Sequence, residues 1–154
     1  KTLAVLEGRL APSGSMVESD LRVTHDVTSV TKAITSALDD GAELVIIYGA
    51  SAITDRRDII PSAIEHAGGR VEHFGMPVDP GNLLLIGSVR DKIVIGAPGC
   101  ARSPKENGFD WVLHRVMADI PVTRADITAL GVGGLLMEIV QRGHPRDPGA
   151  EHVE

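Results

Sequence analysis

The stretch of residues 44–61 constrains the fold of this chain more than any other part of the sequence. It opens with an uninterrupted apolar run, rich in β-branched residues, which Gly49 stops. Such a run is typical of a strand buried on both faces of a sheet. Asp58 then stands where the N-cap of a helix is expected, and Pro61 falls in the first helical turn, where a missing N–H costs little. The sequence therefore predicts a strand, a loop of small residues and a helix N-terminus, a place where α/β proteins bind ligands and where the helix start favours anions.

Strand-like and helix-like patterns alternate on both sides of this stretch. Apolar residues recur at helical spacing near 3–10, 26–38, 58–67, 109–117 and 123–130, and strand-like runs cover 16–23, 70–74, 83–89 and 92–95. The last two runs flank the polar pair Arg90 and Asp91, which predicts an antiparallel β-hairpin. We therefore expect an α/β domain with a mainly parallel sheet and an antiparallel hairpin at one side.

The composition argues against several classes of function. With 15 basic and 21 acidic residues the formal net charge is −6, so the chain lacks the positive footprint of a nucleic-acid-binding protein. One cysteine cannot form an internal disulfide, and no apolar run approaches the roughly 20 residues of a membrane helix. A chain of 154 residues is most simply one domain. We expect a cytoplasmic protein that binds neither nucleic acid nor membranes.

The two ends of the sequence carry further expectations. Leu3, Leu6 and Leu10 share one helical face from the first residues onward, without an initiator Met, which suggests a piece cut from a longer protein. The last residues contain two prolines and few apolar side chains, so a disordered tail is expected over 143–154. The folded domain is therefore expected to cover residues 1–142.

Familiar catalytic motifs are incomplete in this sequence. Ser51 follows Gly49 as in a nucleophile elbow, but Ile53 stands in place of the second glycine, which disfavours a serine nucleophile. No Gly-Lys-Ser/Thr occurs, so there is no P-loop, and Gly-Val-Gly-Gly at 131–134 does not complete a dinucleotide-binding motif. Histidines without ligand-like spacing are interpreted as surface or capping residues: His25, His66, His73 and His114.

A second informative loop covers residues 96–107, which leave a strand and enter a helix. Its hydrogen-bond donors and positive charges suit a phosphate, with a solvated loop as the alternative: Arg102, Ser103, Lys105 and Asn107. Cys100 in the same loop is either a low-pKa nucleophile or a small buried filler. Because this loop and the 49–58 loop both follow strands that run into helices, we expect them at one edge of the sheet, closing over one anionic ligand.

Three turns of the sequence together resemble those of a known family. Tyr-Gly-Ala-Ser at 48–51, followed by Asp58, resembles the Gly-Gly-x-Ser/Thr…Asp motif of the molybdopterin-binding (MoaB/Mog-like) domain, which occurs in molybdenum cofactor biosynthesis enzymes and in gephyrin. Met-Pro-Val-Asp-Pro-Gly-Asn at 76–82 resembles the Met-x-Pro-Gly-Lys-Pro turn of that family. Gly-Ala-Pro-Gly-Cys at 96–100 resembles its Gly-x-Pro-Gly-Asn turn. The order and separations match, and the resemblance covers residues 1–120.

The resemblance implies a fold and a context. The fold would be a three-layer α/β/α sandwich. The sequences of residues 73–82 and 97–110 resemble those of a bacterial branch in which this domain precedes a cytidylyltransferase-like domain. Residues 131–138 would then be the start of the linker between the two domains. Members of the family usually carry a strand before the first helix, and this chain lacks it. A homo-oligomer is left open.

The implied ligand is molybdopterin, a pterin phosphate, or its nucleotide form. Gly49, Ala50 and Ser51 would place backbone and hydroxyl groups near it. Asp58 would hold Mg²⁺ or a pterin amine and would be the catalytic residue. The phosphate would be taken by Arg102, Ser103 and Lys105. The full set of expected cofactor-binding residues is Gly49, Ala50, Ser51, Asp79, Gly81, Asn82, Pro98, Gly99, Cys100, Arg102, Ser103 and Lys105.

Three functions remain open at this point. The first is binding of molybdopterin in the biosynthesis or handling of the molybdenum cofactor. The second is an active nucleotidyl transferase, in which Asp58 and Mg²⁺ neutralise charge on a phosphoryl group taken from ATP or CTP. The third is a non-catalytic module that orders a fused enzyme.

Overall fold

The computed structural model describes residues 1–131. Its elements, in chain order, are α1 (Thr2–Leu10), η1 (Ala11–Ser13), α2 (Val27–Asp39), β1 (Leu44–Tyr48), α3 (Ile59–His66), β2 (Arg70–Phe74), β3 (Leu85–Val89), β4 (Lys92–Ala97), η2 (Gly99–Arg102), α4 (Gly108–Met117) and α5 (Arg124–Ala129). The expected disordered tail and nearly all of the expected linker lie outside the described residues.

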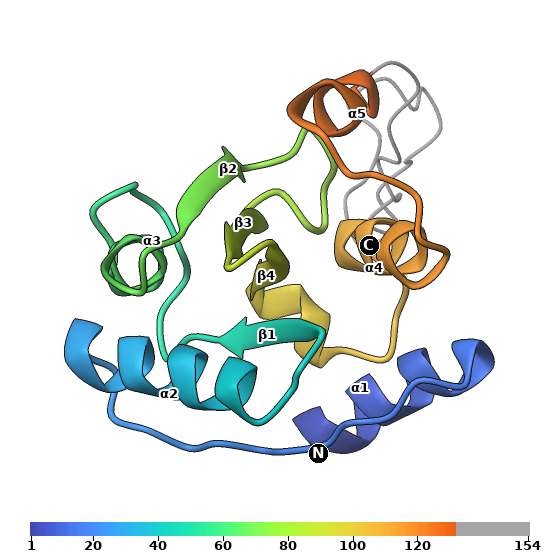
Figure 1. Cartoon of the computed structure of the whole chain (residues 1–154). Helices are drawn as coiled ribbons and strands as arrows, with labels where there is room; N and C mark the ends of the chain where they lie inside the picture. Colours follow the sequence, from blue (N-terminus) through green and yellow to red (C-terminus); the bar gives the residue numbers. More distant parts are fainter. Residues whose placement is uncertain (132–154) are drawn as a thin grey trace, which may run out of the picture.

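Within residues 1–131 the sheet has four strands in the order β1-β4-β3-β2 (Figure 1). β1 pairs with β4 in parallel, with Leu44 opposite Ile93 and Tyr48 opposite Ala97. β3 pairs antiparallel with both β4 and β2. The expected hairpin and the parallel partner of β1 are therefore confirmed. The sheet is mixed rather than mainly parallel, because β2 lies on the outer side of the hairpin and pairs antiparallel with β3.

Helices cover both faces of this sheet, and each face has its own apolar cluster. Along β1, Leu44, Ile46 and Tyr48 pack toward the cluster beneath α1, α4 and α5. Val45 and Ile47 pack toward the cluster beneath α2 and α3. This alternation is the period of two that a strand imposes on its side chains. The α/β class expected from the sequence is confirmed.

Local signals explain several element boundaries. The Asp26 side chain accepts a hydrogen bond from the Ser29 N–H at 2.8 Å and so caps α2. At the tip between β3 and β4, Arg90 and Asp91 have φ of 50° and 63°, which suits a tight hairpin turn. Thr123 begins α5 with a reciprocal capping box, as its sequence predicts.

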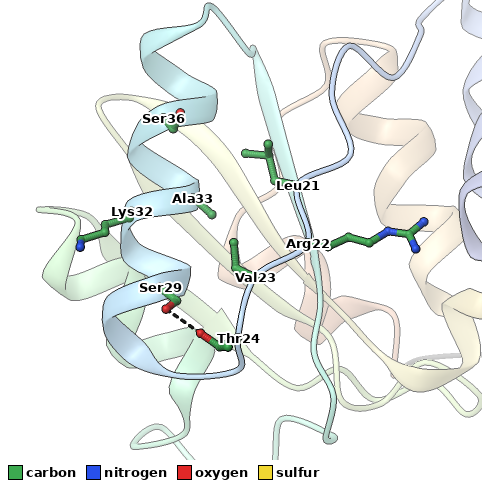
Figure 2. Close-up of a pocket in the computed structure, with 8 residues that line it drawn as sticks. All are labelled: Leu21, Arg22, Val23, Thr24, Ser29, Lys32, Ala33 and Ser36. Atoms are coloured by element: carbon green, nitrogen blue, oxygen red, sulfur yellow. Dashed lines mark hydrogen bonds between the residues drawn. The ribbon is translucent and has the colours of Figure 1, made fainter.

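Two expectations about strands are wrong. β1 lies at an edge of the sheet formed by residues 1–131 and is half-buried along its length, not buried on both faces in the interior. Residues 16–23 form no strand, because within residues 1–131 the segment pairs with no strand of the sheet. Leu21 and Val23 point toward α2 while Arg22 points away (Figure 2). Within the described part of the chain, every helix is too short or too polar to cross a membrane.

Candidate functional site

The two candidate loops lie at the same end of the sheet. β1 and β4 are parallel neighbours, so the chain leaves both strands at the same end of the sheet, the end where their carboxyl termini lie, as the sequence led us to expect. Arg102, at the end of η2, reaches across this edge and donates a hydrogen bond from Nη2 to the Gly49 carbonyl oxygen at 2.7 Å. Its guanidinium also lies 5.3 Å from the centre of the Tyr48 ring. One arginine therefore joins the loop after β1 to the loop after β4.

The loop after β1, residues 49–58, is organised by the Asp58 carboxylate. Its Oδ2 accepts hydrogen bonds from the backbone N–H groups of Thr54 at 2.6 Å and Asp55 at 2.9 Å. Those two amides hold the pKa of Asp58 below its usual value. Asp58 is the N-cap of α3, as predicted, although its side chain closes the preceding loop and makes no capping bond to the helix. The result is an ionised carboxylate fixed at the helix start.

Gly49 sits at a crowded point of this loop. A Cβ there would lie 2.9 Å from the Ser51 carbonyl oxygen and 3.0 Å from Ile60 Cδ1. Ala50 and Ser51 are exposed beyond it. The backbone of this small-residue turn is therefore held close to the end of β1, with its next two residues facing solvent.

His25 lies beside the candidate site, a placement that sequence reasoning missed. Its Nε2 lies 3.3 Å from Ser51 Oγ, and it is half-buried beside the loop after β1. The sequence indicated a surface or capping residue, because the spacing of the histidines shows no ligand pattern. The available signal was its position directly before the N-cap Asp26, which places it at the N-terminus of α2.

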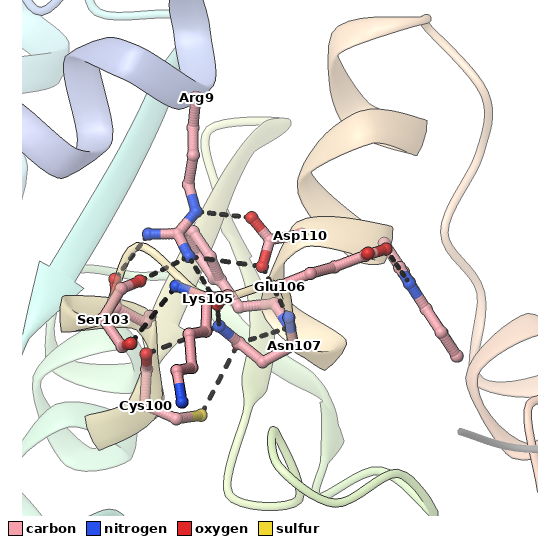
Figure 3. Close-up of polar contacts among 10 residues, drawn as sticks. Arg9, Cys100, Ser103, Lys105, Glu106, Asn107 and Asp110 are labelled. Atoms are coloured by element: carbon pink, nitrogen blue, oxygen red, sulfur yellow. Dashed lines mark hydrogen bonds and ion pairs between the residues drawn. The ribbon is translucent and has the colours of Figure 1, made fainter. Parts of the chain in front are cut away.

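The loop after β4 is anchored by Arg9 of α1 (Figure 3). Its guanidinium pairs with the Asp110 carboxylate and donates to the carbonyl oxygens of Ala101 at 2.7 Å and Ser103 at 2.8 Å. The side chains of Arg9 and Asp110 are only 8% and 9% exposed. A charged pair this far from water is retained only when its hydrogen bonds are satisfied. Sequence reasoning missed Arg9, which lies 101 positions from its partner carboxylate.

Asn107 and Asp110 complete this anchor at the start of α4. They form a reciprocal capping box, in which the Asn107 N–H donates to Asp110 Oδ2 at 2.8 Å. Asn107 Nδ2 also donates to the Lys105 carbonyl oxygen at 3.0 Å. Asn107, expected to offer a donor to phosphate, is buried and used within the loop instead.

Cys100 lies half-buried against the same asparagine, with Sγ 3.5 Å from Asn107 Oδ1. Burial raises the pKa of the Cys100 thiol, and the charge of Asp79 adds to the increase. A thiol that stays protonated at neutral pH is a poor nucleophile. Of the two interpretations left open by the sequence, this environment favours the small filler.

The middle turn, residues 76–82, packs on the start of α4. Gly81 has φ of 133°, and a Cβ there would lie 2.7 Å from the Gly108 nitrogen. The Gly108 N–H in turn donates to the Pro80 carbonyl oxygen at 2.8 Å. Asp79 and Asn82 are exposed on this turn, and the charge of Asp79 is felt by Cys100. The structure thus places this turn beside the loop after β4.

The remaining expected residues belong to η2 and the chain after it. Pro98 is buried as the N-cap of η2, and Gly99 is exposed with open space where a Cβ would lie. Ser103 Oγ accepts from the Lys105 N–H at 3.2 Å, and Lys105 itself is exposed. The loop after β4 therefore carries one arginine engaged with the opposite loop and one lysine free to meet an anion.

A metal ion at this site would need oxygen ligands from the bound molecule in addition to those of the protein. Within residues 1–131, no group of three or more histidine, cysteine or acidic side chains is arranged to hold a metal ion. Mg²⁺ is commonly bound by one or two carboxylates together with phosphate oxygens and water. The ionised Asp58 fits such a site as a single protein ligand.

Comparison with protein-family models, with curated proteins and with solved structures gave no match to this chain.

Proposed function

We propose that this chain binds molybdopterin, or its nucleotide form, in the biosynthesis or handling of the molybdenum cofactor. The observation that carries the proposal is the bridge made by Arg102 between the two loops at the carboxyl ends of β1 and β4. The edge where parallel strands end is the usual binding place in such sheets. The resemblance of the three turns to the molybdopterin-binding family supplies the identity of the ligand.

The phosphate end of the ligand would face the loop after β4. Arg102 donates one hydrogen bond to Gly49. A guanidinium has five N–H donors in a planar fork, so other donors remain for a phosphate. Lys105 adds a second, exposed charge three residues beyond η2, where its backbone N–H donates to Ser103 Oγ. On a chain with a net charge of −6, this local positive charge suits an anionic ligand.

The pterin end would face the loop after β1. The exposed backbone and hydroxyl of Ala50 and Ser51 offer hydrogen bonds to a flat, polar ring. Asp58 would accept from a pterin amine or hold Mg²⁺ between itself and the phosphate, where the metal would neutralise phosphate charge. Two backbone amides keep that carboxylate ionised, which either role requires.

The proposal extends to the fold family and its context. A three-layer sandwich of the MoaB/Mog type is consistent with helices on both faces of a mixed sheet. The bacterial branch, the cytidylyltransferase-like partner domain and a cytoplasmic location follow from the resemblance alone and belong to the same proposal.

Calorimetric titration of molybdopterin into the chain, with and without Mg²⁺, tests this function. A charge-assisted hydrogen bond contributes about 1.5–3 kcal/mol, so Arg102→Ala should weaken binding roughly ten- to a hundredfold. Lys92→Ala is the matched control, because Lys92 begins β4 at the opposite end of that strand. Asp58→Asn should remove the dependence on Mg²⁺.

The other functions appear as distinct outcomes of that titration. A folded wild type that does not bind molybdopterin contradicts the proposal and favours the assembly module. Binding followed by turnover of ATP or CTP identifies the nucleotidyl transferase. Equal weakening by Arg102→Ala and Lys92→Ala would show that only net charge matters and that the site lies elsewhere.

A further inference from the structure

The imidazole ring of His25 lies against the turn of small residues that follows β1. Its Nε2 is 3.3 Å from Ser51 Oγ. A Cβ added to Gly49 would lie 3.3 Å from its Cε1, so the ring also packs close to the backbone of this turn. His25 is half-buried, whereas Ser51 is exposed. The ring therefore supports the turn and leaves the Ser51 hydroxyl open to a ligand.

The position of His25 is set by the start of α2. On one side of it in the chain, Thr24 Oγ1 lies 2.7 Å from Ser29 Oγ (Figure 2). On the other side, Asp26 Oδ1 accepts a hydrogen bond from the Ser29 N–H at 2.8 Å and caps the helix. A side chain carried by such an anchored segment is held more precisely than one on a free loop. His25 therefore reaches Ser51, 26 positions away, from a fixed place in the fold.

His25 shares its surroundings with residues already assigned to the site. It lines the same cavity, of about 1110 Å³, as Gly49, Ala50 and Arg102. The pKa of Asp58 is lowered mainly by hydrogen bonds from backbone amides, and a charge on His25 adds to that decrease. The imidazole therefore lies within electrostatic reach of the carboxylate that organises the loop after β1.

The contact between the imidazole and the Ser51 hydroxyl restricts that hydroxyl. A serine hydroxyl carries one proton and two lone pairs, and its proton rotates to suit its partners. Whether Nε2 donates to Oγ or accepts from it, the bond fixes the hydroxyl in one direction. The remaining donor or acceptor of Oγ then faces solvent, where the ring of the ligand would lie. A group that is ordered before binding loses less entropy when the ligand binds.

We propose that His25 is a positioning residue of the site, which holds the Ser51 hydroxyl in the direction that the pterin ring requires. The inference rests on the proposed function, in which Ser51 meets the pterin end of the ligand. His25 acts through Ser51 and needs no contact of its own with the ligand. Its effect on affinity should therefore vanish when residue 51 has no hydroxyl.

A double-mutant cycle, measured by calorimetric titration of molybdopterin, tests this inference. His25→Ala and Ser51→Ala should each weaken binding roughly three- to tenfold, as expected for the loss of one hydrogen bond. When Ser51→Ala is already present, His25→Ala should weaken binding by less than about twofold, because the group that it positions is gone.

His66→Ala is the matched control for that cycle. His66 is the last residue of α3, at the far end of that helix from the loop after β1. Its Nδ1 donates to the Ser62 carbonyl oxygen of its own helix at 2.7 Å. Loss of this imidazole should leave the affinity for molybdopterin unchanged.

Two further variants separate positioning from packing. In His25→Gln the side-chain amide is as many bonds from Cβ as Nε2 is, so it can still reach Ser51 Oγ. In His25→Asn the amide is one bond closer to Cβ and cannot. His25→Gln should bind molybdopterin within about twofold of the wild type, and His25→Asn should lose as much affinity as His25→Ala. If His25 only packs against the turn, the two variants should bind alike, which would overturn the inference.

Nitrogen NMR of the histidine rings tests the contact without any ligand. Ser51→Ala should shift the Nε2 signal of His25 and leave the signals of His66 unchanged. A His25 signal that does not move would mean that the hydrogen bond is not formed in solution, and it would overturn the inference.

The inference and the proposed function fail in different ways. A wild type that does not bind molybdopterin contradicts the proposed function and removes the inference with it. Binding by the wild type that His25→Ala leaves unchanged overturns the inference alone. Equal effects of His25→Ala with and without the Ser51 hydroxyl would show that His25 does not act through Ser51, and would also overturn the inference alone.

Discussion

The loops after β1 and β4 leave neighbouring parallel strands at one sheet edge, yet they are held in different ways. Arg9, buried and paired with Asp110, anchors the loop after β4 to α1 and α4. The loop after β1 is held by its own Asp58 and by Arg102, which comes from the other loop. The difference indicates that the loop after β4 is fixed by the helices around it, and that the loop after β1 takes its position from the loop after β4.

The largest expected effect comes from removing the scaffold anchor. Arg9→Met leaves the Asp110 carboxylate buried without its partner. Such a change lowers the free energy of unfolding by about 3–5 kcal/mol. The free energy of unfolding, measured with urea, should fall by about that amount. Arg22→Met is the control, because Arg22 pairs with Asp20 in solvent with 85% of its side chain exposed, and such a change should matter by less than about 0.5 kcal/mol.

A second variant separates the anchor from a general packing defect. Asp110→Asn added to Arg9→Met removes the stranded charge and should recover part of the lost stability. If Arg9→Met costs no more than Arg22→Met, the loop after β4 is not held by its buried pair and the comparison between the loops fails.

A pair of glycines gives the next largest contrast. Gly49→Ala would place a Cβ 2.9 Å from the Ser51 carbonyl oxygen, whereas Gly99→Ala meets nothing within 4 Å. Overpacking of this kind costs about 1–3 kcal/mol, so Gly49→Ala should lower thermal stability clearly. Gly99→Ala should change it by less than about 0.5 kcal/mol. Equal effects in thermal melts would show that the loop after β1 adapts freely.

Acid should weaken the loop after β1 through Asp58. Its pKa is lowered in the folded state, so its contribution to stability is present above about pH 4, the unfolded value, and is lost as pH falls through the lower folded pKa. The stability gap between wild type and Asp58→Asn should therefore be constant near neutrality and shrink below about pH 4. Urea unfolding at pH 6, 4 and 2.5 measures it. A gap that does not change with pH would mean that the charge of Asp58 contributes nothing.

The sequence was most informative where local chemistry decides the structure. The apolar run of β1, the N-cap position of Asp58 and the hairpin tip at Arg90 and Asp91 all act over a few residues, and the structure has all three. The meeting of the two loops could be predicted as well, because it follows from strand order.

Long-range pairings could not be predicted from the sequence. Arg9 looks like any helix-surface arginine until α1 packs beside η2 and Asp110. The edge position of β1 was missed for the same reason. An apolar run indicates which residues are buried, but it does not indicate which strands lie beside them. Residues 16–23 alternate like a strand, but Leu21 and Val23 face α2 instead of a neighbouring strand, and each stays 48% exposed.

The central claim, that Arg102 joins the two loops around a phosphate, is tested most directly by a thermodynamic cycle. Molybdopterin and its dephosphorylated form are titrated calorimetrically into wild type and Arg102→Ala. We predict that loss of the phosphate weakens binding to wild type roughly ten- to a hundredfold. The same loss should weaken binding to Arg102→Ala by a clearly smaller factor, because the contact between Arg102 and the phosphate is already gone and only the other phosphate contacts remain. Equal losses in the two proteins would contradict the claim.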